Sequence, residues 1–490
     1  MADEFLHGIK IIREDAEPQP VDPAKMTTIG LIGTGGAGGD ASVWPLDKPL
    51  HVFTDEVDKI AKLGIGGTLR EAFDAIIDQG IIASVVVVRV AAGASEAATL
   101  ANVVGSSAAR TGVHALRIAA AELGIEPTIL IAPGFTHQRV VNGVVSIAVT
   151  DGGEGYTAAM VTITGVGTGA KAEAVISDGA ITAITVTNPG LGYAEVSTIV
   201  TISGDGTGAE ADAVIGSTAN PVIAELLPIA DQLMAVIVAD GPNTTREAAV
   251  QYRQDWNSER LIIVDPAVLI YREGAAAPSV QAASARVAGL GVKRDKEKGG
   301  PFWSWSNQPI GGAVGVARPI SYYINDPDSE ANFLNAHQIA TIYREVGDPS
   351  GGAGGILFWG NESATSDTLW RFYNVRRGRD FIHKSILRTF KTFLGRYNLD
   401  RHTVLAIVES VDAFIRDLKA AGKILDGRAY LEAGVNSPEQ LRLGKLRVEF
   451  AVEEPAPLQT LIFGSRRYRI AYDLLIQDVI REIEQFQLAA

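Results

Sequence analysis

The sequence contains no cysteine. This absence excludes disulfides, thiolate metal sites and cysteine nucleophiles, so the fold must be stabilised by packing and by neighbouring molecules. Long apolar runs are missing as well, since the longest, from Ile81 to Val88, is far shorter than the roughly 20 residues of a membrane-spanning helix. The opening segment, MADEFLHGIK, holds no apolar run of signal-peptide length. We therefore expect a chain that folds in the cytoplasm and has no membrane partner.

Catalytic signatures are also scarce. The sequence has seven histidines, and among them His114, His137, His337, His383 and His402 are scattered singly along the chain. Neither of the patterns H-E-x-x-H and G-x-S-x-G occurs. Ser304 and Ser306 alternate with Trp303 and Trp305, which is typical of a strand or an ordered loop. We expect no catalytic residue, no metal ligand and no cofactor, and hence a protein that is not an enzyme.

The chain does contain enough apolar sequence for several domains. It has 490 residues, of which 47% are hydrophobic and 20% charged, and a single core stops growing at roughly 250 to 300 residues. The formal charge of −14 is uneven: residues 1–360 carry 23 basic and 40 acidic side chains, whereas residues 361–490 carry 20 and 17. Because phosphate contact depends on lysine and arginine, we expect no nucleic-acid partner. The uneven charge fits either different surfaces of one soluble protein or an interface.

A glycine-rich stretch follows the first expected strand. Residues Gly33 to Gly39 contain a literal G-x-G-x-x-G after a strand expected over 26–31. This motif holds a pyrophosphate when it opens a helix whose N-terminal amides face the phosphate. Residues 40–50 carry Pro45 and Pro49 and show no helical period, so we interpret the stretch as a glycine-rich loop. A nucleotide-binding enzyme that uses this loop stays open as a second hypothesis.

Helices and strands then alternate along the chain. Apolar positions at helical spacing predict helices over 54–63, 68–79, 95–101, 111–123, 222–233, 244–256 and 279–290. Continuously apolar, β-branched runs predict buried strands over 81–90, 127–132, 234–238, 261–264 and 268–271. Such an alternation is typical of an α/β sheet with both faces covered.

A repeat interrupts this alternation between residues 139 and 216. Three short segments recur 37 or 39 residues later: GYT at 155 as GYA at 192, VTITG at 161 as VTISG at 200, and GTGA at 167 again at 206. The region holds 2 basic and 8 acidic residues, and it lacks the D-x-[DN]-x-[DN]-G string of a calcium loop. We expect an acidic, surface-exposed β-rich domain inserted into a loop of the α/β domain.

The C-terminal part predicts helices followed by strands. Residues 354–361, GGILFWGN, predict a buried strand, and residues 376–394 and 403–420 have the 3.6-residue period of amphipathic helices. Alternating residues over 445–452 and 466–475 predict two further strands.

The N-terminal segment FLHGIKII, residues 5–12, predicts another strand, which an acidic, proline-bearing linker separates from the body. A frayed N-terminus stays open as the alternative for this segment. Unpaired strands at both ends of a chain are what strand donation between subunits requires, because open sheet edges pair with other chains.

These segments, in this order, resemble the contractile-tail sheath proteins of myophages, especially the P2-like branch. The matching segments in the second half are SNQPIGGAVGVARPISYYINDPDSEANFLNAHQIATIYREVG (306–347), GGILFWGN (354–361), RFYNVRRGRDFIHKSI (371–386) and KLRVEFAVEEPAPLQTL (445–461). Those in the first half are FLHGIKIIRE (5–14), MTTIGLIGTGG (26–36), TLREAFDAIIDQG (68–80), VVVVRV (85–90) and ILIAPGF (129–135). The resemblance covers nearly everything except the repeat.

With the patterns above, the resemblance implies a multidomain α/β and α+β chain. We expect an α/β body with an inserted all-β repeat domain, and an α+β C-terminal domain bearing terminal strands for sheet augmentation between subunits. The expected parts are an N-terminal arm with an exchangeable strand (1–25), the two parts of the α/β sheath domain (26–138 and 219–345), the inserted domain (139–218) and a C-terminal core with a strand arm (346–490).

The resemblance also implies a function. It is that of a structural subunit that polymerises, as stacked sixfold rings, into a helical sleeve around a tail tube and contracts to drive the tube through the host envelope. The implied partners are further copies of the chain, the tube protein, and baseplate and tail terminator proteins. The implied location is the virion tail, with assembly in the host cytoplasm. A tailocin or another contractile injection system stays open as an alternative to a phage tail.

Two groups of residues are the candidates for these contacts. The strands expected to be exchanged between subunits carry Phe5, His7, Ile9 and Ile11 in the N-terminal arm, and Tyr468, Ile470 and Tyr472 in the C-terminal arm. The candidate tube-facing residues of the C-terminal core are Arg376, Arg377, Arg379, Lys384 and Arg388.

Overall fold

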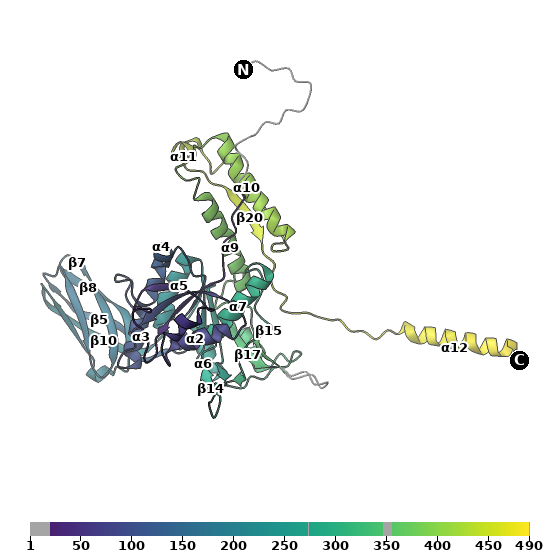
Figure 1. Cartoon of the computed structure of the whole chain (residues 1–490), viewed down its shortest axis with the longest axis horizontal. Coiled ribbons are helices and arrows are strands. Elements are labelled where there is room, and N and C mark those ends of the chain that lie inside the picture. Colours follow the sequence, from purple (N-terminus) through teal and green to yellow (C-terminus); the bar gives the residue numbers. More distant parts are fainter. Residues whose placement is uncertain (1–19, 273, 346–354, 490) are drawn as a thin grey trace, which may run out of the picture. The chain divides into compact units, whose positions relative to one another are not determined.

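The computed structural model describes residues 20–272, 274–345 and 355–489. The expected N-terminal strand, with Phe5, His7, Ile9 and Ile11, lies outside the described residues. By its internal contacts the chain divides into two compact units, residues 1–456 and 457–490. Figure 1 follows the chain by colour from purple to yellow.

The first unit is built on a sheet of nine strands in the order β15-β18-β17-β12-β11-β4-β1-β3-β2. These strands are β1 (Thr28–Thr34), β2 (Pro49–Phe53), β3 (Ser84–Val90), β4 (Ile129–Ile131), β11 (Val236–Asp240), β12 (Leu261–Val264), β15 (Gln308–Pro309), β17 (Ile339–Arg344) and β18 (Ile356–Trp359). The six strands from β3 to β17 run parallel, whereas β2, β18 and β15 pair antiparallel at the two edges. The continuously apolar central strands fit burial on both faces.

Helices cover both faces of this sheet. They are α1 (Val57–Ala61), α2 (Thr68–Ile77), α3 (Glu96–Val104), the 3₁₀ helix η1 (Gly112–Ile118), α4 (Ala119–Leu123), α5 (Pro221–Leu233), α6 (Arg246–Gln254), α7 (Ser284–Lys298) and α8 (Glu330–Ala336). Alternate side chains of one strand enter two separate cores: Val85 and Val87 of β3 pack with α2 and α7, whereas Val86 and Val88 pack with α3 and α5. The expected mixture of helices and sheets is confirmed.

The strand Ile356–Trp359 corrects one expected boundary. The sequence placed GGILFWGN in the C-terminal core, but β18 pairs antiparallel with β17 inside the nine-stranded sheet. Phe358 is fully buried in the core that contains α2 and α7. The expected boundary after residue 345 therefore falls between two neighbouring strands of one sheet. A further strand of the same sheet and the first strand of a new domain have the same apolar pattern, so the pattern could not separate them.

The glycine-rich loop has a packing role. The Gly36 amide donates to the Leu63 carbonyl at 2.8 Å, and Ala37 and Ile65 form an isolated bridge. A Cβ on Gly36 would lie 2.3 Å from the carbonyl oxygen of Gly66, so only glycine fits there. The next described helix is α1, which begins at Val57. The loop therefore does not open a helix, as expected, and its glycines permit two backbone segments to touch.

The repeat forms a sheet of its own with six strands in the order β10-β5-β8-β7-β6-β9. The strands are β5 (Val140–Glu154), β6 (Ala159–Thr164), β7 (Thr168–Ser177), β8 (Ala180–Leu191), β9 (Ile199–Gly204) and β10 (Thr207–Thr218). The strands at the two ends of this order, β9 and β10, also contact each other, and β7 and β8 contact α3 (Figure 1).

The core of this repeat module consists of equivalent residues from the two copies. Its six buried side chains form three pairs, each separated by 37 residues: Val144 with Ile181, Ile147 with Ile184, and Tyr156 with Tyr193. Each tyrosine ring packs on the first glycine of a GTGA segment, Tyr193 on Gly167 and Tyr156 on Gly206. A Cβ at either glycine would lie within 2.5 Å of the ring, so the close packing requires glycine. Each copy of the repeat supplies half of the core, and the two copies form a complete core only together.

Replacing residues 141–217 with a short Gly-Ser linker is expected to leave the α/β body folded. Val140 and Thr218 are paired neighbours at the base of the module, so the cut ends lie close together. The amide of Asn220 donates to the carbonyls of Phe135 and Gln138, both at 2.9 Å, and this clamp does not need the module. The melting temperature of the body should shift by less than about 4 °C, which calorimetry measures. An unfolded or aggregated variant would contradict this prediction.

The remaining elements of the first unit are a small sheet and a helical C-terminal part. Strands β13 (Val268–Ile270), β14 (Ser279–Gln281) and β16 (Gly315–Val316) pair antiparallel. The C-terminal part contains α9 (Tyr373–Phe390), α10 (Arg401–Ala420), β19 (Asp426–Tyr430), α11 (Pro438–Arg442) and β20 (Glu449–Glu453). Helices α9 and α10 confirm the two amphipathic helices expected there.

The second unit corrects the last expected strand. Residues 457–468 have no regular structure, and α12 (Ile470–Ala489) is a helix, so Ile470 and Tyr472 are helical and Tyr468 precedes the helix. The alternation over 466–475 is short, whereas Leu475, Val479, Ile483 and their neighbours continue with a period near four residues. The longer period decides the structure. Within the described residues, no helix combines the length and apolar character needed to cross a membrane.

Candidate functional site

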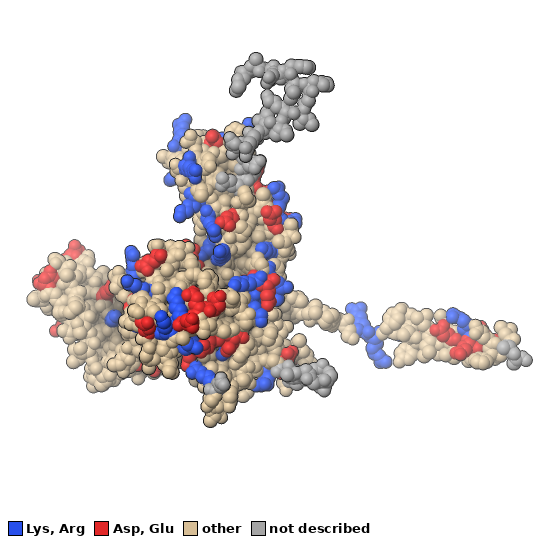
Figure 2. Space-filling view, viewed as in Figure 1, with Lys and Arg blue, Asp and Glu red and all other residues tan. Residues whose placement is uncertain are grey.

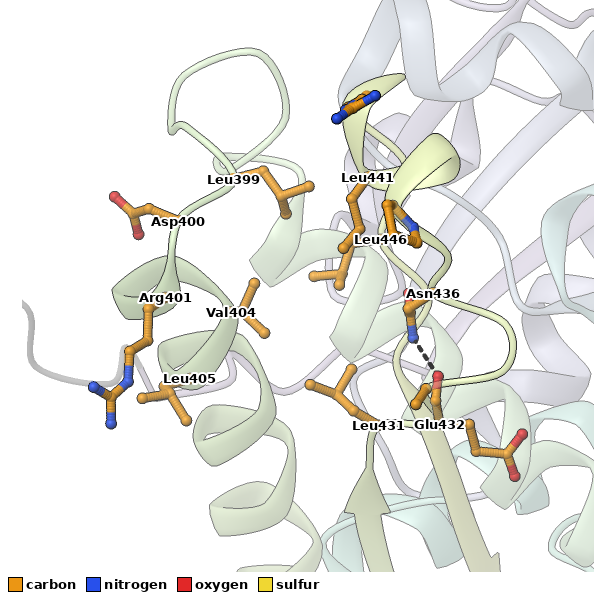
Figure 3. Close-up of a pocket in the computed structure, with 13 residues that line it drawn as sticks. Leu399, Asp400, Arg401, Val404, Leu405, Leu431, Glu432, Asn436, Leu441 and Leu446 are labelled. Atoms are coloured by element: carbon orange, nitrogen blue, oxygen red, sulfur yellow. Dashed lines mark hydrogen bonds between the residues drawn. The ribbon is translucent and has the colours of Figure 1, made fainter.

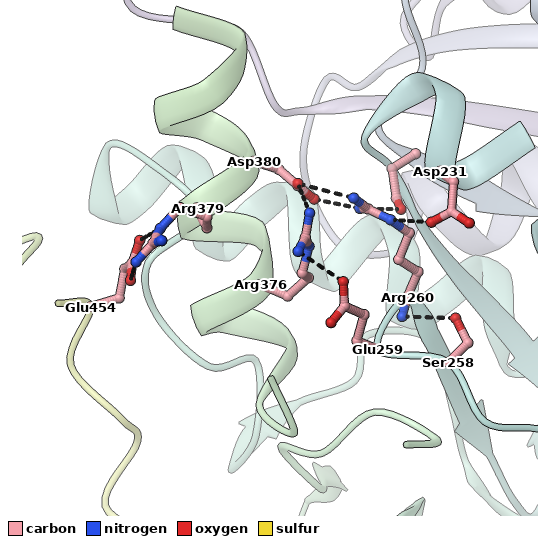
Figure 4. A network of polar contacts seen from close by, with 9 residues as sticks. Asp231, Ser258, Glu259, Arg260, Arg376, Arg379, Asp380 and Glu454 are labelled. Atoms are coloured by element: carbon pink, nitrogen blue, oxygen red, sulfur yellow. Dashed lines mark hydrogen bonds and ion pairs between the residues drawn. The ribbon is translucent and has the colours of Figure 1, made fainter. Parts of the chain in front are cut away.

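Helix α9 carries all five candidate tube-facing residues, and most of them face inward. Arg376 and Arg260 of the loop before β12 both hold the Asp380 carboxylate, with Arg376 Nη2 at 2.7 Å and Arg260 Nη1 at 2.5 Å (Figure 4). Arg376 also pairs with Glu259, and Arg260 with Asp231. Asp380 is fully buried between α9 and the α/β body. The two guanidinium groups compensate the cost of burying its negative charge.

Arg377 lies deeper still. Its side chain is 1% exposed and holds the equally buried Asp295 of α7 with two bonds of 2.6 and 3.0 Å. The guanidinium stacks 4.6 Å from the Trp305 ring centre, and the Trp305 indole donates to the same carboxylate at 3.3 Å. Burial raises the pKa of Asp295, and Arg377 opposes that shift. This pair joins α9 to α7 and cannot contact another protein.

The other three basic residues of the set differ in exposure. Arg379 makes two bonds to Glu454, at 2.7 and 2.8 Å, and one to the Val452 carbonyl, which ties β20 to α9 (Figure 4). The mostly buried Lys384 pairs with Glu126 at 3.0 Å. Only Arg388 is more than half exposed, at 54%. The burial of Arg377 speaks against a tube-facing role for this residue, whereas that role stays a prediction for Arg376, Arg379, Lys384 and Arg388. An amphipathic pattern cannot tell a solvent face from a second buried interface.

The serines next to two tryptophans also have a structural role. The Tyr373 hydroxyl lies 3.1 Å from the Ser304 hydroxyl, accepts from the Trp305 amide at 2.9 Å and donates to the Gly360 carbonyl at 3.0 Å. Burial raises the pKa of Tyr373 to about 12, so the phenol stays neutral. This network fixes the start of α9 to the loop after β18. It explains the alternation in FWSWSN without catalysis.

The described end of the N-terminal linker packs along α9. The Asp22 amide donates to Thr389 Oγ1 and the Ala24 amide to Ser385 Oγ, both at 2.9 Å. Arg377 donates to the Met26 carbonyl at 3.2 Å, and Met26 is buried in the core of the C-terminal part. The sequence treated this linker as separate from the body. Its hydrogen bonds instead give the N-terminal arm a fixed starting point on α9.

The double substitution Ser385→Ala with Thr389→Val is expected to release this linker. Each change leaves one backbone amide without its acceptor, at a cost of about 1 kcal/mol each. Hydrogen exchange at the Asp22 and Ala24 amides should accelerate, whereas amides inside α9 keep their protection. Thr392→Val in the turn just after this helix is the control, because the Thr392 hydroxyl donates to the Thr389 carbonyl and not to the linker. Unchanged exchange at both amides would show that these hydroxyls do not hold the linker.

A two-stranded sheet with open edges lies beside α9 and α10. Strands β19 and β20 pair antiparallel, with Asp426 opposite Glu453 and Tyr430 opposite Glu449. Within residues 20–272, 274–345 and 355–489 no third strand joins them. A hollow of about 500 Å³ runs along the end of the sheet that holds Asp426 and Glu453. Two strands alone are marginal, and an unpaired edge is a template for another chain.

A second hollow of about 700 Å³, the α10–α11 groove, opens at the other end of this sheet. Figure 3 shows Leu399, Val404 and Leu405 at the start of α10 facing Leu431, Leu441 and Leu446. The Asn436 amide donates to the Glu432 carbonyl at 3.0 Å and holds the loop that forms one wall. The sequence analysis missed this groove, because its leucines come from three separate segments.

The candidate site is thus a set of open surfaces. In the described part of the chain no group of three or more histidine, aspartate or glutamate residues lies close enough together to hold a metal ion. The polar networks around α9 are internal, and the open features are the sheet edge, the α10–α11 groove and the exposed α12. Of the exchange candidates, Tyr468, Ile470 and Tyr472 are all exposed.

Comparison with known proteins identifies the family. The chain is 31% identical over 486 residues to the tail sheath protein of Burkholderia phage BcepMu, with 94% of this chain and 97% of that protein covered. The chain belongs to the tail sheath protein family. A family model described as the phage tail sheath C-terminal domain matches residues 365–466, which include α9, α10, β19 and β20.

Two further similarities agree with this assignment. A putative prophage major tail sheath protein of Pseudomonas aeruginosa (strain UCBPP-PA14) is 28% identical over 457 residues, with 92% of this chain and 94% of that protein covered. The fold is similar to the helical sheath of the anti-feeding prophage in its contracted state, with a TM-score of 0.59 at 14% identity and coverage of 95% of this chain and all of that one. The resemblance seen in the sequence is confirmed.

Proposed function

We propose that this chain is the structural subunit of a contractile tail sheath, which polymerises into a helical sleeve around a tail tube and contracts to drive the tube through a host envelope. The observation that carries the proposal is the match along nearly the whole length to a tail sheath protein. The geometry around α9 supports it, since buried ion pairs make a rigid core and the open features are surfaces for other chains.

Subunits are linked by donated strands in this proposal. The first donor is the N-terminal arm, with Phe5, His7, Ile9 and Ile11, and the linker residues Asp22 and Ala24 that follow it are bonded to α9. The irregular segment 457–469 is exposed and basic, since it carries Arg466, Arg467 and Arg469, and it is the second candidate strand for the open sheet edge. Both arms add strands to the β19–β20 sheet of neighbouring copies. Tyr468 stays in the donated segment, while Ile470 and Tyr472 belong to the helix after it.

Such a contact joins different surfaces of two copies, so it does not close along the axis and propagates a helix. We propose stacked sixfold rings as the assembly, with the tube protein inside and baseplate and terminator proteins at the two ends. The location is a virion tail, assembled in the host cytoplasm. The same subunit would serve in a tailocin or another contractile injection system, and genes next to the coding gene distinguish these settings. Contraction slides rigid protomers while the donated strands keep them tied.

A nucleotide-dependent enzyme is the alternative from another class. It requires Gly33 to Gly39 to present amides to a phosphate, whereas the Gly36 and Ala37 amides are bonded to carbonyls of the neighbouring loop. Calorimetric titration with NAD or ATP tests this alternative directly. Binding that is lost in Gly35→Val would revive it.

Electron microscopy of the purified full-length chain in negative stain tests the proposal. A sheath subunit gives long striated sleeves at high protein concentration, because every added copy repeats the same contact. Monodisperse small particles at all concentrations would overturn the proposal.

A further inference from the structure

Helix α12 presents an apolar face that its own unit leaves uncovered. Seven residues fall on one side of the helix, with exposed fractions between 42% and 72%: Tyr472, Leu475, Ile476, Val479, Ile480, Ile483 and Phe486. The opposite side carries Gln477, Arg481 and Gln485, together with Ile470, Leu474 and Leu488. An amphipathic helix gains most of its stability when its apolar face packs against another surface. We therefore expect the 20-residue α12 to pack against a partner.

The α10–α11 groove is an apolar surface of matching kind on the first unit. Its walls are Leu399, Val404 and Leu405 on one side and Leu431, Leu441 and Leu446 on the other (Figure 3). Apolar anchors at helical spacing that enter a hydrophobic groove are a recurring mode of recognition between proteins. The groove is about 700 Å³ in volume, which is enough for several side chains of a helix.

We propose that the α10–α11 groove of one copy binds helix α12 of a second copy. Charge at the rim favours this occupant, whereas within the lining Arg401 and Arg442 are balanced by Asp400 and Glu432. Residues 470–489 carry four acidic side chains and one basic one, whereas each of the two segments that flank the groove, 391–401 and 437–447, carries three basic and one acidic. Figure 2 shows several basic side chains around α11. Complementary potentials of this kind fix orientation and exclude wrong partners.

The position of the groove agrees with the proposed strand donation, on which this inference rests. A segment added antiparallel to β20 would run from the end with Glu453 toward the end with Glu449, and Leu431 and Leu446 lie just beyond that end. The segment 457–469 has 13 residues, which extend to roughly 43 Å, and a five-residue strand needs only about 17 Å. A donated strand therefore delivers α12 to the groove of the same neighbour.

The absence of cysteine allows a direct test on the full chain. One preparation carries Leu405→Cys in the groove, and a second, differently tagged preparation carries one cysteine on α12. Ile476→Cys, Val479→Cys and Ile483→Cys lie on the apolar face, and Gln477→Cys and Gln485→Cys are the matched controls on the polar face. The two preparations are mixed under polymerising conditions, and a short bismaleimide links neighbouring thiols. Crosslinked pairs with both tags should form several-fold more from the apolar-face positions than from the controls.

Each outcome separates the inference from the proposed function. Sleeves that form without preferential crosslinking from the apolar face would overturn the helix-in-groove contact and leave the sheath function standing. Efficient crosslinking inside single Leu405→Cys/Val479→Cys chains, with none between mixed chains, would show that the groove holds the helix of its own chain and overturn the second copy as occupant. Particles that neither polymerise nor crosslink would overturn both.

Discussion

Replacing Arg377 with methionine is expected to lower the free energy of unfolding by about 3–5 kcal/mol, because it leaves the Asp295 carboxylate buried without its partner. Asp295 and Arg377 are both 1% exposed, so bulk solvent does not reach the carboxylate in the native packing. The carboxylate must take up a proton or draw water into the core between α7 and α9. Urea unfolding followed by tryptophan fluorescence measures the change locally, since Trp305 stacks on the guanidinium.

The matched control lies on the same helix. Arg388→Met removes a guanidinium that is 54% exposed and pairs with an exposed Asp22, so it should change the unfolding free energy by less than about 1 kcal/mol. The double variant Arg377→Met with Asp295→Asn should recover part of the loss, because no unpaired charge then stays buried. Equal losses from Arg377→Met and Arg388→Met would show that the buried pair does not hold α9 to the α/β body.

The sequence was most informative where one physical pattern dominates. The continuously apolar run over 85–88 predicts a strand that is buried on both faces of its sheet. Alternate side chains of β3 do pack into two separate cores. The repeat was also visible, and the structure adds that its buried pairs, such as Tyr156 and Tyr193, follow the offset of 37 residues. Two proline residues after the glycine-rich stretch correctly argued against a phosphate-binding helix.

The sequence was least informative where a residue's role depends on a distant partner. Arg376, Arg377 and Arg379 follow one another closely on α9, yet their carboxylate partners Glu259, Asp295 and Glu454 come from three separate parts of the chain. No local pattern contains these pairings. Basic residues beside an apolar stripe therefore looked like a solvent face, although that face packs on the α/β body.

The terminal helix shows a second limit. Over ten residues, a period of two and a period near four predict similar apolar positions, and the helix becomes evident only when the pattern is followed to Phe486. This correction also changes the proposed mechanism. A C-terminal arm that ends in an amphipathic helix can contact a neighbour in two places. In the proposal, the irregular segment pairs with the β19–β20 edge and the helix binds the α10–α11 groove.

The N-terminal arm should be essential for polymerisation and dispensable for folding. Deleting residues 1–14 removes the expected exchange strand with Phe5, His7, Ile9 and Ile11 and leaves the linker bonds of Asp22 and Ala24 to α9 in place. We expect a soluble protomer with unchanged melting temperature that forms no sleeves. The effect is large because the contact recurs in every subunit, and each 1.4 kcal/mol lost per contact weakens association about tenfold.

Sedimentation and negative-stain microscopy of the deletion variant measure this loss, and the variant without residues 141–217 is the control. The control removes far more chain, yet it takes away a module whose core is separate from that of α9, α10 and β20, so sleeves should still form. The comparison separates a specific arm contact from a general sensitivity to shortening. Normal sleeves from the arm deletion would contradict strand donation by this arm, and loss of sleeves in the control would place the repeat module at an assembly contact.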